Sequence, residues 1–222
     1  LDSKAYKSDV GKVVLKRKPL GLILGIMPWN FPFWQVFRFA IPNLIMGNGI
    51  ILKHASNVGA TAAIIQDTFI AAGFPKRLYT NIYVESHRAE ELIGHPDIRA
   101  VSLTGSEAAG RSVATIAGKH LKKTVLELGG SNALLVMPDA AVSKAVKLAA
   151  QARIVNAGQS CIAAKRILIP KSWEKDFVRR LNEEISGLRS GDPILPSTQL
   201  APLARREMAA KLERQVSDSL GK

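Results

Sequence analysis

Four short segments of this 222-residue chain hold residues whose types and spacing could carry chemistry. The most reactive side chain among them is that of the single cysteine, Cys161, which ends the polar run Gly158-Gln159-Ser160-Cys161. A thiolate is a strong nucleophile, and a polar, turn-like context favours an accessible thiol. The alternative is a small buried side chain, which is the commoner role of a lone cysteine.

The second segment, residues 28–32 with the sequence PWNFP, directly follows an apolar run. Two prolines restrict the turn and two aromatic residues flank Asn30, so the Asn30 amide could be held rigidly enough to stabilise an oxyanion. The alternative is a rigid corner without a catalytic role, because asparagine is a common turn residue.

The third segment places Glu127 between Leu126 and Leu128, ahead of Gly129 and Gly130. A carboxylate partly desolvated by leucines would have a raised pKa and could serve as a general base. The alternative is a glutamate whose side chain extends into solvent, and without further context that interpretation is favoured.

The fourth segment, Thr104-Gly105-Ser106, lies between an apolar run and a helical pattern. Backbone N–H groups at such a helix start can bind a phosphate. The glycines do not form the G-x-G-x-x-G pattern, and Gly-Ser before a helix is also ordinary capping.

Alternating apolar runs and helical patterns must position these segments. The patterns predict strands over residues 20–26, 50–53, 81–84, 98–103, 123–126, 132–136 and 164–169. They predict helices over residues 34–46, 57–72, 86–94, 106–120, 139–156, 172–188 and 202–219, with Pro42 kinking or breaking the first, Asn57 capping the second and Gly73 stopping it. This alternation predicts an α/β fold with a parallel sheet, and the paired glycines 129–130 mark the expected domain boundary.

The composition excludes several other classes of protein. With 31 Lys+Arg against 18 Asp+Glu the net charge is +13, but the excess is spread out, apart from Lys16-Arg17-Lys18, and only 6% of residues are aromatic. We therefore expect neither a nucleic-acid partner nor a membrane partner, and the single cysteine excludes a disulfide scaffold. No secretory signal pattern opens the chain, so we expect a cytoplasmic protein, and we expect no metal site.

Taken together and in this order, the segments resemble the signatures of the aldehyde dehydrogenase superfamily, with Leu52-Lys53 as a fifth match. The stretches 27–38, 52–58 and 159–166 are most similar to its bacterial NAD(P)-dependent succinate-semialdehyde dehydrogenase branch. One departure is Ser131-Asn132-Ala133, where many relatives of that branch carry Ser-Asp-Pro.

The resemblance implies a catalytic role for three residues. Cys161 would add to the aldehyde carbon, Asn30 and the Cys161 N–H would bind the oxyanion, and Glu127 would activate the water that hydrolyses the thioester. Arg38 could be a surface charge or a carboxylate-binding group, and the surface interpretation is slightly favoured.

The resemblance also implies a site for NADP or NAD. Lys53 would bind the adenosine ribose and Ser106 the pyrophosphate. Ser56 stands where NAD-preferring relatives often carry a glutamate that would repel a 2′-phosphate, so we expect that NADP is accepted. The cofactor-binding residues implied in this way are Trp29, Lys53, Ser56, Gly105, Ser106 and Leu128.

Full-length family members are about twice as long, so the chain resembles the central half of one. Residues 1–128 would form a partial Rossmann-type nucleotide-binding domain, with 1–18 resembling the tail of an oligomerisation hairpin. Residues 129–222 would begin the α/β catalytic domain. The expected partners are a small aldehyde and, at full length, further copies in a homo-oligomer. The alternative is a truncated, non-catalytic remnant or interaction protein on the same scaffold.

Overall fold

The computed structural model describes residues 3–221, which divide into two compact units between Gly129 and Gly130. We call residues 3–129 the N-terminal unit and residues 130–221 the C-terminal unit. Within residues 3–221 no helix combines the length and apolar character required to cross a membrane.

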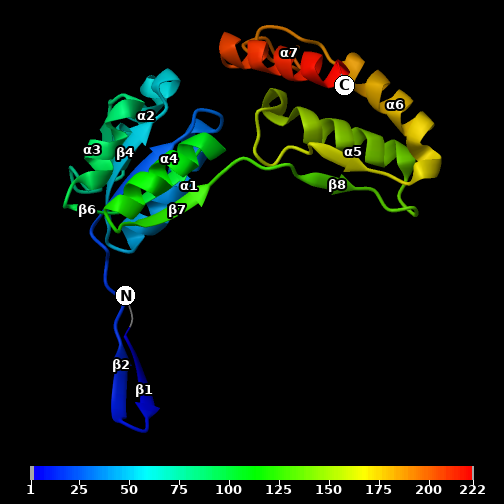
Figure 1. Ribbon diagram of the computed structural model, residues 1–222. Coiled ribbons are helices and arrows are strands. Elements are labelled where there is room, and N and C mark those ends of the chain that lie inside the picture. Colours follow the sequence, from blue (N-terminus) through cyan, green and yellow to red (C-terminus); the bar gives the residue numbers. More distant parts are fainter. Residues whose placement is uncertain (1–2, 222) are drawn as a thin grey trace. The chain divides into compact units, whose positions relative to one another are not determined.

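A five-stranded parallel sheet forms the centre of the N-terminal unit (Figure 1). Its strand order is β5-β4-β3-β6-β7. The strands are β3 (Leu22–Met27), β4 (Gly49–His54), β5 (Tyr79–Ile82), β6 (Ile98–Thr104) and β7 (Lys123–Glu127). The apolar run that predicts β3 is continuous because this strand is buried on both faces, as central parallel strands are.

Helices cover both faces of this sheet, and side chains of β3 alternate between two cores. Ile23 and Met27 pack with residues of α1 (Pro32–Ile45) and α2 (Gly59–Ala71). Leu24 packs instead with residues of α3 (Ala89–Gly94) and α4 (Glu107–Lys119). The predicted α/β fold with a parallel sheet is therefore confirmed.

The chain reverses its direction across the sheet at β3. It runs from β3 through β4 to the β5 edge, and then returns to β6 on the other side of β3. In open parallel sheets such a switch point leaves a crevice outside the carboxyl ends of the two strands, and ligands bind there. The segments that follow β3, β4 and β6 all leave this edge.

Two helix details differ from the sequence prediction. Pro42 does not break α1, which continues to Ile45, because only one turn follows and the proline removes a single hydrogen bond. Asn57 does not cap α2, because it lies inside a 3₁₀ turn, Ser56–Val58, closed by the Val58 N–H to the Ala55 carbonyl at 3.1 Å. Gly73 does end α2, with φ of +85°.

The C-terminal unit is smaller and its sheet has two parallel strands. These are β8 (Ala133–Leu135) and β9 (Arg166–Leu168). Its helices are α5 (Val142–Ile154), α6 (Glu174–Ser186) and α7 (Arg206–Leu220). Val146 and Ala149 of α5 pack with Phe177 of α6 to form the core of this unit.

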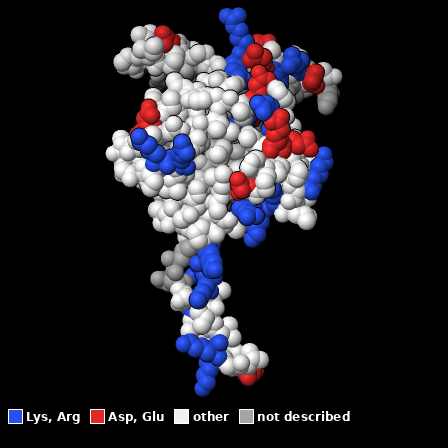
Figure 2. All heavy atoms as spheres, turned by 90° about the vertical axis from the view of Figure 1, so that its left-hand side faces the viewer, with Lys and Arg blue, Asp and Glu red and all other residues white. Residues whose placement is uncertain are grey.

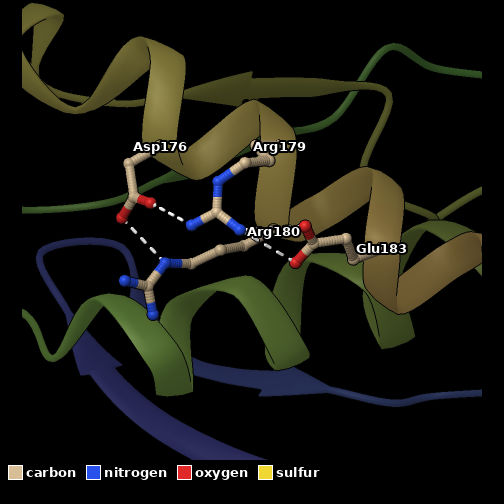
Figure 3. Close-up of polar contacts among 4 residues, drawn as sticks. All are labelled: Asp176, Arg179, Arg180 and Glu183. Atoms are coloured by element: carbon tan, nitrogen blue, oxygen red, sulfur yellow. Dashed lines mark hydrogen bonds and ion pairs between the residues drawn. The ribbon is translucent and has the colours of Figure 1, made fainter.

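The outer face of α6 carries a network of ion pairs, drawn in Figure 3. Arg179 donates to Asp176 at 2.6 Å and to Glu183 at 2.9 Å, and Arg180 donates to Asp176 at 2.7 Å. All four side chains are exposed, and such pairs at spacings of three and four residues support a helix weakly. The network therefore keeps this face of the helix charged and adds little stability.

An antiparallel hairpin precedes the parallel sheet. Its strands are β1 (Lys4–Ser8) and β2 (Gly11–Leu15), and every residue of both is exposed. Figure 2 shows basic side chains along this hairpin, where Lys7 and Lys12 lie directly opposite one another. Facing like charges are unfavourable, so side-chain pairing at this position does not stabilise the hairpin.

The close approach of α1 to β3 gives a stability prediction at Gly25. A Cβ at this position would overlap with Phe39 Cε1, inside the core that α1 and α2 share with the sheet. We expect Gly25→Val to lower the free energy of unfolding by about 1–3 kcal/mol, as overpacking of a core does. Urea denaturation followed by circular dichroism measures the change.

The matched control is Gly118→Ala in α4, where an added Cβ would contact nothing within 4 Å. Alanine favours a helix, so this variant should keep the parent stability or gain up to about 1 kcal/mol. Equal stability of the Gly25→Val variant and the parent chain would contradict the packing described for β3 and α1.

Candidate active site

The turn that carries Asn30 leaves the carboxyl end of β3 and leads directly into α1. Pro32 occupies the first position of α1, where its missing N–H is not needed, and the Gln35 N–H donates to the Phe31 carbonyl at 3.0 Å. Trp29 and Asn30 are both half-buried in this turn. The turn is thus fixed by the helix that follows it.

A buried histidine, His54, ties this turn to the end of β4. The Ala55 N–H lies 3.0 Å from His54 Nδ1, and His54 Nε2 lies 3.0 Å from the Pro32 carbonyl oxygen. His54 Nδ1 also lies 3.2 Å from the Met27 carbonyl oxygen, which accepts from the Ala55 N–H at 3.0 Å. The neutral ring that accepts at Nδ1 and donates from Nε2 satisfies the contacts with Ala55 and Pro32. Burial lowers the pKa of His54 by more than its contacts with the Pro32 and Met27 carbonyls raise it, and the ring is therefore neutral.

Glu127 ends β7 and faces away from the leucines that flank it. Leu126 and Leu128 pack into the core beneath α4, and successive side chains of a strand point to opposite faces. The Glu127 side chain is 54% exposed, and its Oε1 lies 3.5 Å from Nη2 of Arg38 on α1. The leucines therefore do not desolvate this carboxylate, because they occupy the other face of an edge strand, and the favoured alternative of a side chain that extends toward solvent is observed.

Arg38 and Glu127 line a cavity of about 310 Å³ in the N-terminal unit. Gln35 and Thr104 also line it, and Gln35 is only 3% exposed. Its Oε1 has no hydrogen-bond partner within the described part of the chain. The cavity thus combines apolar walls with a cation and a carboxylate.

The expected cofactor residues gather at the same edge of the sheet. Ser106 caps α4, with its Oγ accepting from the Ala109 N–H at 3.3 Å, so the capping alternative for this serine is observed. The Gly105 N–H donates to the Glu127 carbonyl at 2.9 Å, which holds the start of α4 against the end of β7. The Ser106 hydroxyl hydrogen is still free to donate in this arrangement.

Lys53 lies near the end of β4, and Ser56 lies in the turn that follows this strand. Lys53 is 8% exposed, and burial lowers the pKa of its ammonium. Ser56 is exposed at the start of the 3₁₀ turn.

Leu128 differs from the other expected cofactor residues, because its side chain packs against α4. It occupies the space that Gly110 leaves on this helix, only 2.5 Å from where a Cβ on that glycine would lie. Leu128 is therefore partly engaged in packing against α4.

Cys161 lies in the C-terminal unit, in the segment between α5 and β9. Its side chain is half-buried and forms no disulfide. The Gln159 side chain accepts from the Ala204 N–H at 2.9 Å and donates to the Asn156 carbonyl at 3.0 Å. The structure thus brings Asn30, Glu127 and the expected cofactor residues to one sheet edge of the N-terminal unit and places Cys161 in the other unit.

Three polar residues of these segments had no assigned role in the sequence interpretation. They are Gln35, His54 and Lys165, and Arg38 was favoured as a surface charge. The sequence context of two of them could have indicated a role. His54 is a polar residue at the end of an apolar strand, and Gln35 lies on the apolar face of a helix that begins directly after a turn. Sequence spacing alone does not reveal the backbone groups that His54 and Lys165 contact.

Comparison with known proteins identifies the family of this chain. Residues 2–222 match the aldehyde dehydrogenase family. The chain belongs to this family. Over all 222 residues it is 44% identical to a protein named succinate-semialdehyde dehydrogenase [NADP(+)] from Deinococcus radiodurans, of which it covers 46%. Over 220 residues, 99% of the chain, it is 44% identical to a probable succinate-semialdehyde dehydrogenase [NADP(+)] from a Synechocystis strain, of which it covers 48%.

Solved aldehyde dehydrogenase structures share the fold. A succinic semialdehyde dehydrogenase from Streptococcus pyogenes, in complex with NADP+, matches 98% of this chain with a TM-score of 0.93 and 35% identity. An aldehyde dehydrogenase from Mycobacterium tuberculosis, complexed with NAD+, matches 99% with a TM-score of 0.95 and 28% identity. This chain covers 48% and 45% of those chains, so it spans about half the length of the family members it matches.

The lowered pKa of His54 predicts a pH-dependent stability. Because the unfolded chain takes up a proton at its ordinary pKa of about 6.5 and the folded chain only at a lower pH, folding is opposed below that pH. We expect the free energy of unfolding to fall by up to about 1.4 kcal/mol per pH unit between the two pKa values.

The His54→Gln variant tests this, since its side-chain amide can still donate to the Pro32 carbonyl but does not titrate. Urea denaturation from pH 8 to pH 5 should show a shallower loss of stability than in the parent chain. His87→Gln, at an exposed position, is the matched control for the substitution itself. Parallel pH profiles of the His54→Gln variant and the parent would refute a buried neutral histidine.

Proposed function

We propose that this protein contributes the central part of an NADP-dependent aldehyde dehydrogenase that oxidises succinate semialdehyde to succinate. The observation that carries the proposal is the gathering of Asn30, Lys53, Ser106 and Glu127 at the carboxyl edge of the parallel sheet. The names of the relatives that are 44% identical support the choice of substrate and cofactor.

The residues at this edge fit an anionic dinucleotide. The start of α4 offers backbone donors and the Ser106 hydroxyl, and such helix starts suit a pyrophosphate. The Lys53 ammonium at the end of β4 suits a ribose or its 2′-phosphate. A nicotinamide dinucleotide, when bound, supplies the acceptor for the hydride that leaves the substrate.

In the proposed reaction Cys161 acts as the nucleophile. Its thiolate sulfur bonds to the aldehyde carbon, and the carbonyl oxygen becomes an oxyanion that the Asn30 amide and the Cys161 N–H stabilise. Loss of hydride from the same carbon leaves a thioester on Cys161. Glu127 then takes a proton from water, which attacks the thioester, breaks the C–S bond and releases the acid and the thiolate.

Arg38 supports a substrate that carries a carboxylate in addition to its aldehyde. Its guanidinium lines the cavity beside Glu127 and is 43% exposed, so it is accessible to a ligand as well as to that carboxylate. Succinate semialdehyde carries a carboxylate at the end opposite its aldehyde, and arginine binds carboxylates through paired donors. We therefore assign Arg38 to substrate recognition in this proposal.

A non-catalytic role is the second candidate. The observation that favours it is the apolar surface of the N-terminal unit, where Trp34 and Ile45 of α1 and Val125 of β7 are 65%, 76% and 62% exposed. Exposed apolar side chains on neighbouring elements are typical of an interaction surface.

An assay of NADPH formation with succinate semialdehyde distinguishes the two candidates. In a complete enzyme that contains this segment we expect turnover, and Cys161→Ser should lose more than about 10³-fold in kcat, because the hydroxyl is a far weaker nucleophile. The 222-residue chain by itself should show little or no turnover. Glu127→Gln should still form one equivalent of NADPH rapidly and then stall, since only thioester hydrolysis needs the base. An active Cys161→Ser variant would overturn the mechanism, and a complete enzyme that binds NADP without turnover would favour the non-catalytic role.

Ser56 gives a prediction for cofactor choice. A carboxylate at this position would repel a 2′-phosphate at short range, whereas serine does not. We expect Ser56→Glu to lower kcat/KM for NADP by about 10- to 100-fold and to affect NAD much less. Ser56→Ala is the neutral control, and an unchanged NADP/NAD ratio in Ser56→Glu would show that Ser56 lies away from the 2′-position.

A further inference from the structure

The segment that carries Cys161 is gathered around one lysine ammonium. Lys165 Nζ donates to the Cys161 carbonyl at 3.0 Å, to the Ser160 carbonyl at 3.3 Å and to the Ala163 carbonyl at 3.4 Å. An ammonium has three N–H donors, so one side chain can serve three backbone acceptors. Charge-assisted bonds of this kind are stronger than those between neutral groups.

The contact between Lys165 and the Ser160 carbonyl also fixes the direction of the Cys161 N–H. A trans peptide unit is planar, so the Ser160 carbonyl and the Cys161 N–H point in opposite directions. Because Lys165 holds the Ser160 oxygen, the Cys161 N–H is directed away from Lys165. The same lysine holds the Cys161 carbonyl, so both peptide units that flank Cys161 are constrained by one side chain.

The backbone just before Cys161 explains why such a constraint is needed. Asn156 and Ala157 have φ of 53° and 54°, and Gly158 follows with φ of 75°. The left-handed conformation is unfavourable for residues with a Cβ, and it persists only where the surroundings hold it. Side-chain contacts from Gln159 on one side of Cys161 and Lys165 on the other help to hold this segment. Two backbone bonds add to them, from the Ala163 N–H to the Ser160 carbonyl at 3.2 Å and from the Ala164 N–H to the Ala152 carbonyl at 3.0 Å.

We propose that Lys165 is a positioning residue that holds the Cys161 segment in one conformation and thereby directs the Cys161 N–H toward the substrate oxyanion. The catalytic part of this inference rests on the proposed function. The conformational part does not, because it concerns backbone groups of the C-terminal unit alone. Lys165 itself neither reacts nor contacts the substrate in this proposal.

Backbone amide exchange measured by NMR tests the conformational part in the chain as it is. Lys165→Met keeps a chain of similar length but removes the donors, and Lys165→Arg restores a cation with donors. In Lys165→Met we expect the amides of Ala163 and Ala164, which donate to the Ser160 and Ala152 carbonyls, to exchange about tenfold faster, because their segment is released. Lys165→Arg should recover most of the protection. Lys175→Met on α6 is the matched control and should leave these amides unchanged.

Turnover tests the catalytic part. In a preparation that oxidises succinate semialdehyde, Lys165→Met should lower kcat by about tenfold with the KM for NADP unchanged, and Lys165→Arg should restore most of kcat. A complete enzyme without turnover speaks against the proposed function, while amide exchange still decides the role of Lys165 in the segment.

Three results would overturn the proposal. The first is unchanged exchange of the Ala163 and Ala164 amides in Lys165→Met. The second is faster exchange spread evenly over α5 and α6 without recovery in Lys165→Arg, because that pattern reports general destabilisation of the unit. The third is a local increase in exchange with an unaffected kcat, which would remove the catalytic consequence.

Discussion

The pairing of β3 with β4 on one side and β6 on the other is the constraint on which the N-terminal unit depends. All three strands are parallel, so their carboxyl ends lie at one edge and the segments that follow them leave from that edge. Burial of both faces of β3 fixes this strand at the centre, because either face would otherwise expose apolar side chains. Residues that are far apart in sequence, such as Asn30 and Ser106, gather at the edge for this reason.

Buried polar side chains then hold the segments at both edges of the sheet. At the carboxyl edge His54 contacts the turn that carries Asn30. At the opposite edge the Asn48 side chain, 5% exposed, accepts from the Leu20 N–H at 2.7 Å and the Gly21 N–H at 3.2 Å. A buried polar group without a partner is costly, so each of these side chains favours one arrangement of its segment.

In the C-terminal unit, the segment that carries Cys161 is held in a different way from the segments at the sheet edges. Its core is small, and the segment with Cys161 contains backbone conformations that apolar packing does not favour. Hydrogen bonds from Gln159 and Lys165 to backbone groups hold this segment. The nucleophile proposed for the reaction therefore depends on charged and amide side chains, whereas the proposed cofactor residues depend on strands of a well-packed sheet.

Local patterns in the sequence were sufficient for most elements of the fold. The apolar run before residues 28–32 predicts β3, and the Ser106 position predicts the start of α4, because strand burial and helix capping are local properties. Asn57 shows the limit of such reasoning. A short polar residue before a helical pattern suits a cap, but Asn57 lies inside the 3₁₀ turn that precedes the helix and does not cap it.

What the sequence by itself determined is the set of chemically capable residues and the strands that deliver them. Only the tertiary structure decided what surrounds each one. Leucines beside Glu127 in sequence suggest desolvation, yet strand alternation and the edge position of β7 turn that carboxylate toward Arg38 and solvent. Likewise nothing in the spacing of Lys165 indicates three carbonyl partners. Exposure and hydrogen bonding depend on which faces and segments meet in space, and sequence neighbours do not report that.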